Sequence, residues 1–86
     1  ALILRNHGLL TAGRTVCDAF VTMHWLEKAC QAQIDGMAAG TKVTTIAPTV
    51  QEHTKQHFAQ REVLSAQRDW PGLLRQLDRI DPSYKT

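Results

Sequence analysis

Histidines are the residues in this sequence best suited to hold a metal ion or move a proton near neutral pH. His7 stands in the turn-forming stretch Arg5-Asn6-His7-Gly8, between two short apolar runs. This placement suits a metal ligand or an acid–base group, because Gly8 allows a close backbone approach. A turn histidine is more often a bystander, however, and a catalytic zinc site needs three protein ligands. His7 is therefore a candidate that cannot form a site by itself.

His53 and His57 are a second candidate. Histidines four residues apart lie on one helix face and can hold one metal ion. The residues between them, Thr54-Lys55-Gln56, lack the glutamate that zinc proteases use as a general base, and Lys55 would oppose a nearby cation. A solvated polar helix face is the simpler interpretation.

The other reactive or aromatic side chains have structural explanations. His24, beside Trp25 in an apolar helical pattern, is expected at the edge of the core, and Trp25 and Trp70 are expected to pack. Cys17 and Cys30 lie on one expected helix, roughly 20 Å apart at 1.5 Å per residue, which is too far for a disulfide. Reduced thiols and a cytoplasmic location are the expected reading.

Two short strands are expected on either side of His7. The runs 1–4 and 9–12 are apolar, and 5–8 is rich in residues that tolerate a tight bend. Gly13 closes the second strand. The pattern predicts two strands that meet at a bend carrying His7.

A long helix is expected next, over about residues 16–39. Thr15 and Asp18 have the spacing of a capping box, and Gly40 supplies a stop. Apolar residues recur behind Thr15 at three- and four-residue steps: Val16, Phe20, Met23, Leu26, Cys30, Ile34 and Met37. A helix of this length is expected to pack on a large surface, most of which lies outside these residues.

Two further helices are expected after a connector at 41–48. Thr49 and Glu52 repeat the capping spacing and predict a helix that runs to about Ser65. Its apolar stripe is thin and contains Val50, Phe58, Val63 and Leu64.

The third expected helix begins at Asp69 as the cap, with Pro71 in its first turn. Asp81-Pro82 ends it, because the residue before a proline is pushed out of helical geometry. Its expected buried face consists of Trp70, Leu73, Leu74, Leu77 and Ile80.

Length and composition indicate one small globular unit. The chain has 86 residues, of which 43% are hydrophobic and 21% charged, with a formal charge of +2. This charge is too small to indicate nucleic acid or an anionic membrane as a partner. No apolar run approaches the ~18 residues that span a bilayer, and no secretory signal is visible. Because Ala1 begins directly in a strand, we expect a fragment of a larger domain.

Residues 1–40 resemble the class II aldolase/adducin family. The resemblance rests on Leu2-Ile3-Leu4-Arg5-Asn6-His7-Gly8, on the Gly13-x-Thr15 turn into the long helix, and on Leu26-Glu27-x-Ala29 within it. The closing stretch 70–84 is similar to the tail of bacterial members. Residues 1–86 are thereby identified as the C-terminal portion of a single domain of this family.

The resemblance implies an α/β fold with three α/β/α layers, of which this chain holds a hairpin, a long helix and two further helices. It also implies Zn²⁺ or another divalent ion bound by three histidines, with His7 the third and an upstream His-x-His pair supplying the others. The metal would act on a small hydroxy-carbonyl substrate, a class that includes sugar phosphates, as a Lewis acid that stabilises the enediolate of carbon–carbon cleavage. The catalytic glutamate lies upstream, so the fragment alone is expected to be inactive.

Two alternatives to a lyase remain open. Leu4-Arg5-Asn6-His7-Gly8 also resembles the animal adducin heads, which are assembly modules of the membrane skeleton without known aldolase activity. Other relatives carry out epimerisation or dehydration on the same scaffold, so family membership does not fix the reaction. The resemblance further implies a homo-oligomer, commonly a tetramer.

Overall fold

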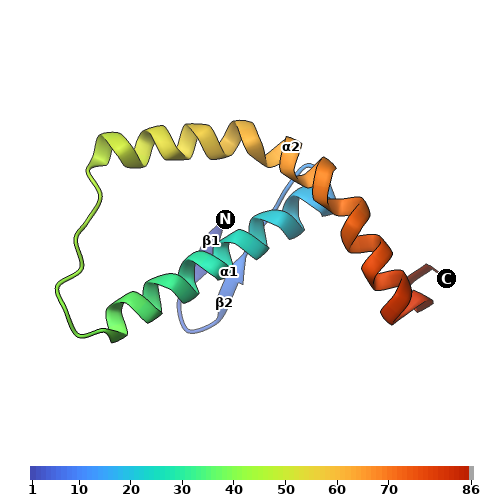
Figure 1. Ribbon diagram of the computed structural model, residues 1–86, viewed down its shortest axis with the longest axis horizontal. Coiled ribbons are helices and arrows are strands. Elements are labelled where there is room, and N and C mark those ends of the chain that lie inside the picture. The colour runs from blue at the N-terminus through green and yellow to red at the C-terminus, as the bar shows by residue number, and fades with distance from the viewer. Residues whose placement is uncertain (86) are drawn as a thin grey trace.

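The computed structural model describes residues 1–85, and the side chains of all of these except residues 61–66. Its elements follow one another along the chain as two strands, two α-helices and a closing 3-10 helix (Figure 1): β1 (Leu2–Leu4), β2 (Gly8–Leu10), α1 (Val16–Ala38), α2 (Pro48–Ile80) and η1 (Pro82–Lys85). The predicted α/β content is confirmed. The three-layer arrangement stays a prediction.

The hairpin forms as the turn residues predict. β1 and β2 are antiparallel, with Leu2 opposite Leu10 and Leu4 opposite Gly8. The bend places Asn6 at φ 55° and Gly8 at φ 145°. Asparagine and glycine tolerate positive φ better than other residues do, so the sequence fits the backbone that this bend requires.

A close approach joins β2 to α1. The Thr11 hydroxyl donates a hydrogen bond to the Ala19 carbonyl at 2.9 Å. Gly13 lies so near the helix that a Cβ there would stand 2.6 Å from the Ala19 nitrogen. The absence of a side chain at residue 13 therefore lets the chain pass against the first turn of α1.

The predicted capping box is confirmed at the start of α1. The Asp18 amide donates to the Thr15 hydroxyl oxygen at 3.1 Å. The Thr15 amide donates to Asp18 Oδ2, also at 3.1 Å. These bonds satisfy two of the amides that a helix N-terminus leaves without intrahelical partners.

We expect Thr15→Ala to lower the free energy of unfolding by about 1 kcal/mol, because alanine lacks the hydroxyl oxygen that accepts the hydrogen bond of the Asp18 amide. Chemical denaturation followed by circular dichroism measures the change. Thr45→Ala, in the exposed connector between the helices, is the matched control and should leave the unfolding midpoint unchanged. An equal effect of the two substitutions would contradict the role of the cap.

The prediction of two helices after the connector is wrong, because α2 is one helix of 33 residues with Pro71 inside it. Asp69 does not cap a new helix. Its carboxylate instead accepts hydrogen bonds from the Arg68 guanidinium at 2.8 and 3.3 Å. A proline inside a helix costs one backbone bond and bends the axis without having to end the helix. The two ends of α2 run in different directions in Figure 1.

The predicted cap at Thr49 is also wrong. α2 begins at Pro48, with Ala47 as an N-cap residue that makes no side-chain hydrogen bond. Proline is well suited to the first helical position, because its φ is already helical and its missing amide hydrogen is not needed there. The Gln51 side chain donates to the Ile46 carbonyl at 2.6 Å and ties the connector to the helix.

The predicted end of α2 is confirmed, since Asp81 is extended at φ −156° and ends the helix. The short helix η1 then turns back along α2. The Tyr84 hydroxyl donates to Asp78, and Lys85 Nζ lies 2.8 Å from Asp78 Oδ1. The bonds from Lys85 and Tyr84 lower the pKa of the Asp78 carboxyl. This cluster anchors the C-terminal turn.

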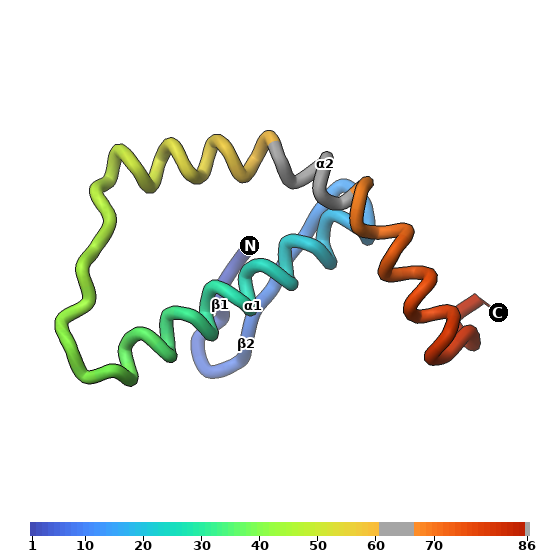
Figure 2. Tube along the Cα trace, viewed as in Figure 1, coloured from blue at the N-terminus to red at the C-terminus, as the bar shows by residue number. Residues whose placement is uncertain are grey.

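Packing between α1 and α2 is limited to one crossing. Phe20 and Trp70 meet edge to face, with ring centroids 5.6 Å apart. Val21, which is 5% exposed, is the only buried residue among the described side chains. The tube in Figure 2 shows α1 and the beginning of α2 joined by a long connector and otherwise lying apart. The radius of gyration is 16.0 Å, against about 12 Å for a compact chain of this length.

Most of the apolar stripe on α1 faces solvent. Val16 is 77% exposed, Ile34 61% and Met37 60%. The large surface expected to cover this stripe does not lie within the described part of the chain.

The predicted buried face near the end of α2 is only partly buried. Trp70 and Leu74 are half-buried, whereas Ile80 is exposed. Val50 and Phe58, from the thin stripe, are exposed, and Val63 and Leu64 lie outside the described side chains.

No helix in the searched residues is long and apolar enough to cross a membrane.

Candidate metal-ligand site

His7 lies at the bend of the hairpin with its side chain exposed. Its backbone amide donates to the Leu4 carbonyl at 3.2 Å, which holds the residue at a defined position in the turn. No hydrogen bond or ion pair to another described residue occupies the imidazole. The ring is therefore positioned by the backbone and remains able to bind a ligand from outside this chain segment.

A complete metal site is not formed by the described residues. They contain no group of three histidine, cysteine or acidic side chains close enough to hold an ion. The imidazole of His7 is a suitable nitrogen donor for zinc, and its exposure leaves room for further ligands. The residues present thus fit one ligand of a three-histidine set and not the whole set.

The other predicted candidates lie on the helices. His53 and His57 form a pair on α2 whose rings stack with centroids 6.2 Å apart. On α1 the rings of His24 and Trp25 meet edge to face, with centroids 5.4 Å apart. Both residues are exposed, so the predicted packing of Trp25 and the place of His24 at the edge of the core are not seen in the described residues. Cys17 and Cys30 are half-buried on α1 and form no disulfide, which confirms that prediction. Desolvation raises the pKa of the Cys17 thiol, and the Asp18 charge adds to the effect.

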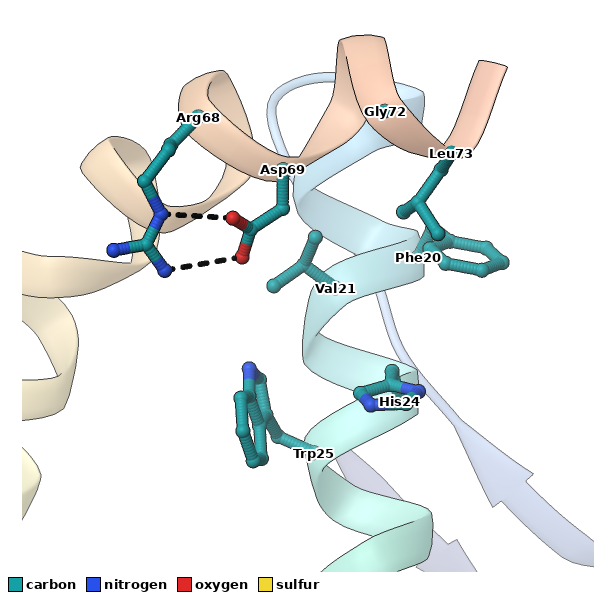
Figure 3. Close-up of a pocket in the computed structure, with 8 residues that line it drawn as sticks. All are labelled: Phe20, Val21, His24, Trp25, Arg68, Asp69, Gly72 and Leu73. Atoms are coloured by element: carbon teal, nitrogen blue, oxygen red, sulfur yellow. Dashed lines mark hydrogen bonds and ion pairs between the residues drawn. The ribbon is translucent and has the colours of Figure 1, made fainter. Parts of the chain in front are cut away.

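A groove between α1 and α2 was not predicted from the sequence. It has a volume of about 410 Å³ and is lined by four residues from each helix (Figure 3): Phe20, Val21, His24, Trp25, Arg68, Asp69, Gly72 and Leu73. The hydrogen bond and charge of Asp69 raise the pKa of the Arg68 guanidinium. His24 and Trp25 stand out individually in the sequence. Their place beside α2 in the groove could not be predicted, because α1 and this part of α2 are far apart in the sequence.

A hairpin that carries a histidine at its bend and leads through a capped turn into a long helix defines an α/β unit with one potential metal ligand. The sequence model of the Class II Aldolase and Adducin N-terminal domain matches residues 1–34. This stretch contains the hairpin, the turn and most of α1. His7 therefore lies within the matched segment.

Curated relatives match most of the chain. A Pseudomonas aeruginosa protein whose name places it in aldolase class 2 is 34% identical over 88 residues, covering 98% of this chain and 34% of that protein. A Caulobacter vibrioides protein with a similar name is 34% identical over 84 residues, covering 96% and 33%. Human beta-adducin is 35% identical over 71 residues, covering 83% and 9%. No solved structure matches.

The chain belongs to the class II aldolase and adducin family. It spans about a third of the length of the two bacterial relatives, whose shares are 34% and 33%. The relatives include proteins named for aldolases and proteins named for adducins, so the family is established and the reaction is a separate question.

Proposed function

We propose that the protein of which these residues form part is a divalent-metal lyase of the class II aldolase type, with His7 as one of three histidine ligands. The observation that carries the proposal is the exposed imidazole, which stands at a backbone-fixed bend within the segment 1–34 that matches the family. A ligand on a hairpin bend is held by the strands on both sides. This rigidity favours a defined coordination geometry.

The residues of this chain would orient one ligand rather than carry out the bond cleavage. Asn6 and Gly8 adopt the positive φ angles that shape the bend, and the Leu4 carbonyl accepts a hydrogen bond from the His7 amide. When bound, the ion supplies Lewis-acid stabilisation of the negative charge that develops on the substrate oxygens. The proposed substrate class is a small hydroxy-carbonyl compound, including sugar phosphates.

Metal content tests the proposal directly. We expect about one divalent ion per chain to remain with the whole protein after gel filtration, and none with His7→Ala, because two remaining ligands hold zinc much less tightly than three. Elemental analysis of the two proteins gives the result. His24→Gln is the control, since it removes a histidine outside the proposed site and should retain the ion. A metal-free wild-type protein after reconstitution would remove the basis of the proposal.

A second candidate function is a non-catalytic assembly module like the adducin head. Two observations favour it: the 35% identity to human beta-adducin over 71 residues, and the apolar side chains of α1 that remain exposed, including Ile34 and Met37. In that case the protein would form oligomers without a bound ion. Metal content and light scattering of the whole protein together separate the functions, because an assembly module forms oligomers without a bound ion, whereas the lyase retains about one ion per chain.

A further inference from the structure

The first part of α2 is not packed against another element within the described part of the chain. All residues from 48 to 60 are exposed, and the N-cap residue Ala47 makes no side-chain hydrogen bond. Isolated helical segments of this length are marginal in water, and most helices in proteins depend on packing for stability. An interaction that stabilises the helical conformation on this surface would therefore strongly increase the helix content of the first part of α2.

His53 and His57 occupy one face of this exposed segment. Their imidazole rings lie one helical turn apart, with centroids 6.2 Å apart and planes inclined by 28°. No hydrogen bond or ion pair to any residue in the described part of the chain engages either ring. Both rings are thus available to an external ligand.

The spacing of the two rings suits a shared ion. A nitrogen ligand lies about 2.0–2.1 Å from zinc, so an imidazole centre lies roughly 3 Å from the ion. Two rings on one ion can therefore have centroids up to roughly 6 Å apart. The observed separation of 6.2 Å is slightly larger than this value, and rotation of the exposed side chains can bring the rings closer.

The charges around the pair also permit a cation. Lys55 is two residues from each histidine, which places it about 200° around the helix axis, on the opposite face. Its ammonium lies 3.7 Å from the Glu52 carboxylate. The repulsion expected from the sequence alone therefore does not act at the face that carries the histidines.

We propose that His53 and His57 form a second metal site, a two-histidine clip for a late first-row divalent ion such as Zn²⁺, Ni²⁺ or Cu²⁺, which stabilises the first part of α2. Imidazole is a preferred ligand of these ions. The remaining coordination positions are filled by water. The ion binds the helical form better than the unfolded form, because only a helix brings residues 53 and 57 together, and it therefore raises helix stability.

Cu²⁺ is the probe for this site, because it binds nitrogen sites most tightly in the divalent series. A His7→Ala background weakens the site proposed for the lyase, and any Cu²⁺ that its two remaining histidines still hold does not depend on His57. We expect one His57-dependent Cu²⁺ per chain with two imidazole nitrogens in its electron paramagnetic resonance spectrum, and a gain in helical circular dichroism on binding. His57→Gln should weaken binding at least tenfold and remove one nitrogen from the spectrum.

A matched variant separates chelation from the number of histidines. His57→Gln combined with Ala59→His restores the histidine count at an exposed position, but residues 53 and 59 lie on different faces of the helix. This variant should bind as weakly as His57→Gln and gain no helicity. Binding as tight as in the parent, or a parent spectrum without two imidazole nitrogens, would overturn the proposal. Circular dichroism without metal verifies that the variants remain folded.

Discussion

If the protein is the proposed lyase, His7→Ala is expected to lower its kcat/KM for aldol cleavage about a thousandfold or more, which corresponds to about 4 kcal/mol of lost transition-state stabilisation. Loss of the proposed ligand would remove the ion, and with it the Lewis acid that would stabilise developing negative charge. A steady-state assay with a panel of small hydroxy-carbonyl substrates measures the effect.

The loss should be separable from any change in folding. The His7 side chain is exposed and has no hydrogen bond or ion pair among the described residues, and the positive φ of the bend belongs to Asn6 and Gly8. The melting temperature of metal-depleted His7→Ala should therefore equal that of metal-depleted wild type. His24→Gln is the activity control. A His7→Ala protein that keeps full activity would show that this imidazole has no part in the reaction.

Gly13→Ala is expected to destabilise the protein by about 2 kcal/mol, because the new methyl group would overlap the helix backbone. Its Cβ would stand 2.6 Å from the Ala19 nitrogen, 2.7 Å from the Asp18 Cβ and 3.0 Å from the Asp18 carbonyl carbon. The backbone atoms cannot rotate away as a side chain can. Relief requires the chain to move from α1, which also strains the bond from Thr11 to Ala19.

Gly36→Ala is a control with the same chemical change, and it is expected to raise the free energy of unfolding rather than lower it. Gly36 lies inside α1, and nothing stands within 4 Å of a Cβ placed there. Alanine in a helix interior is favoured over glycine by about 0.5–1 kcal/mol. Urea denaturation of both variants gives the comparison. If Gly13→Ala were as stable as Gly36→Ala, the close contact between the turn and α1 would not constrain the fold.

Short-range signals predicted the structure well. The capping box of Thr15 and Asp18, the bend at Asn6 and the helix end at Asp81 each depend on residues a few positions apart. Their geometry follows from hydrogen-bonding groups and backbone preferences that the sequence states directly. The position of His7 on a hairpin bend was predictable for the same reason.

Features that depend on distant segments were missed. Val21 lies beside the predicted stripe of α1, and it is buried because α2 crosses the helix there. Pro71 looked like the first turn of a new helix, because a proline is equally compatible with a helix start and with a bend inside a longer helix. Thr49 has the spacing of a capping residue, but Pro48 lies one residue earlier and is itself favoured at the first helical position. α2 therefore begins at Pro48.

The difference between short-range and long-range contacts also affects the order in which the chain folds. The bond from His7 to Leu4 and the bonds between Thr15 and Asp18 each close a loop of three residues. Hairpins and helical turns form within microseconds. The contact of Phe20 with Trp70 closes a loop of fifty residues and carries a larger entropic cost. The bend that presents His7, the proposed ligand, can therefore form before the two helices meet, whereas the crossing of the helices carries the larger entropic cost of loop closure.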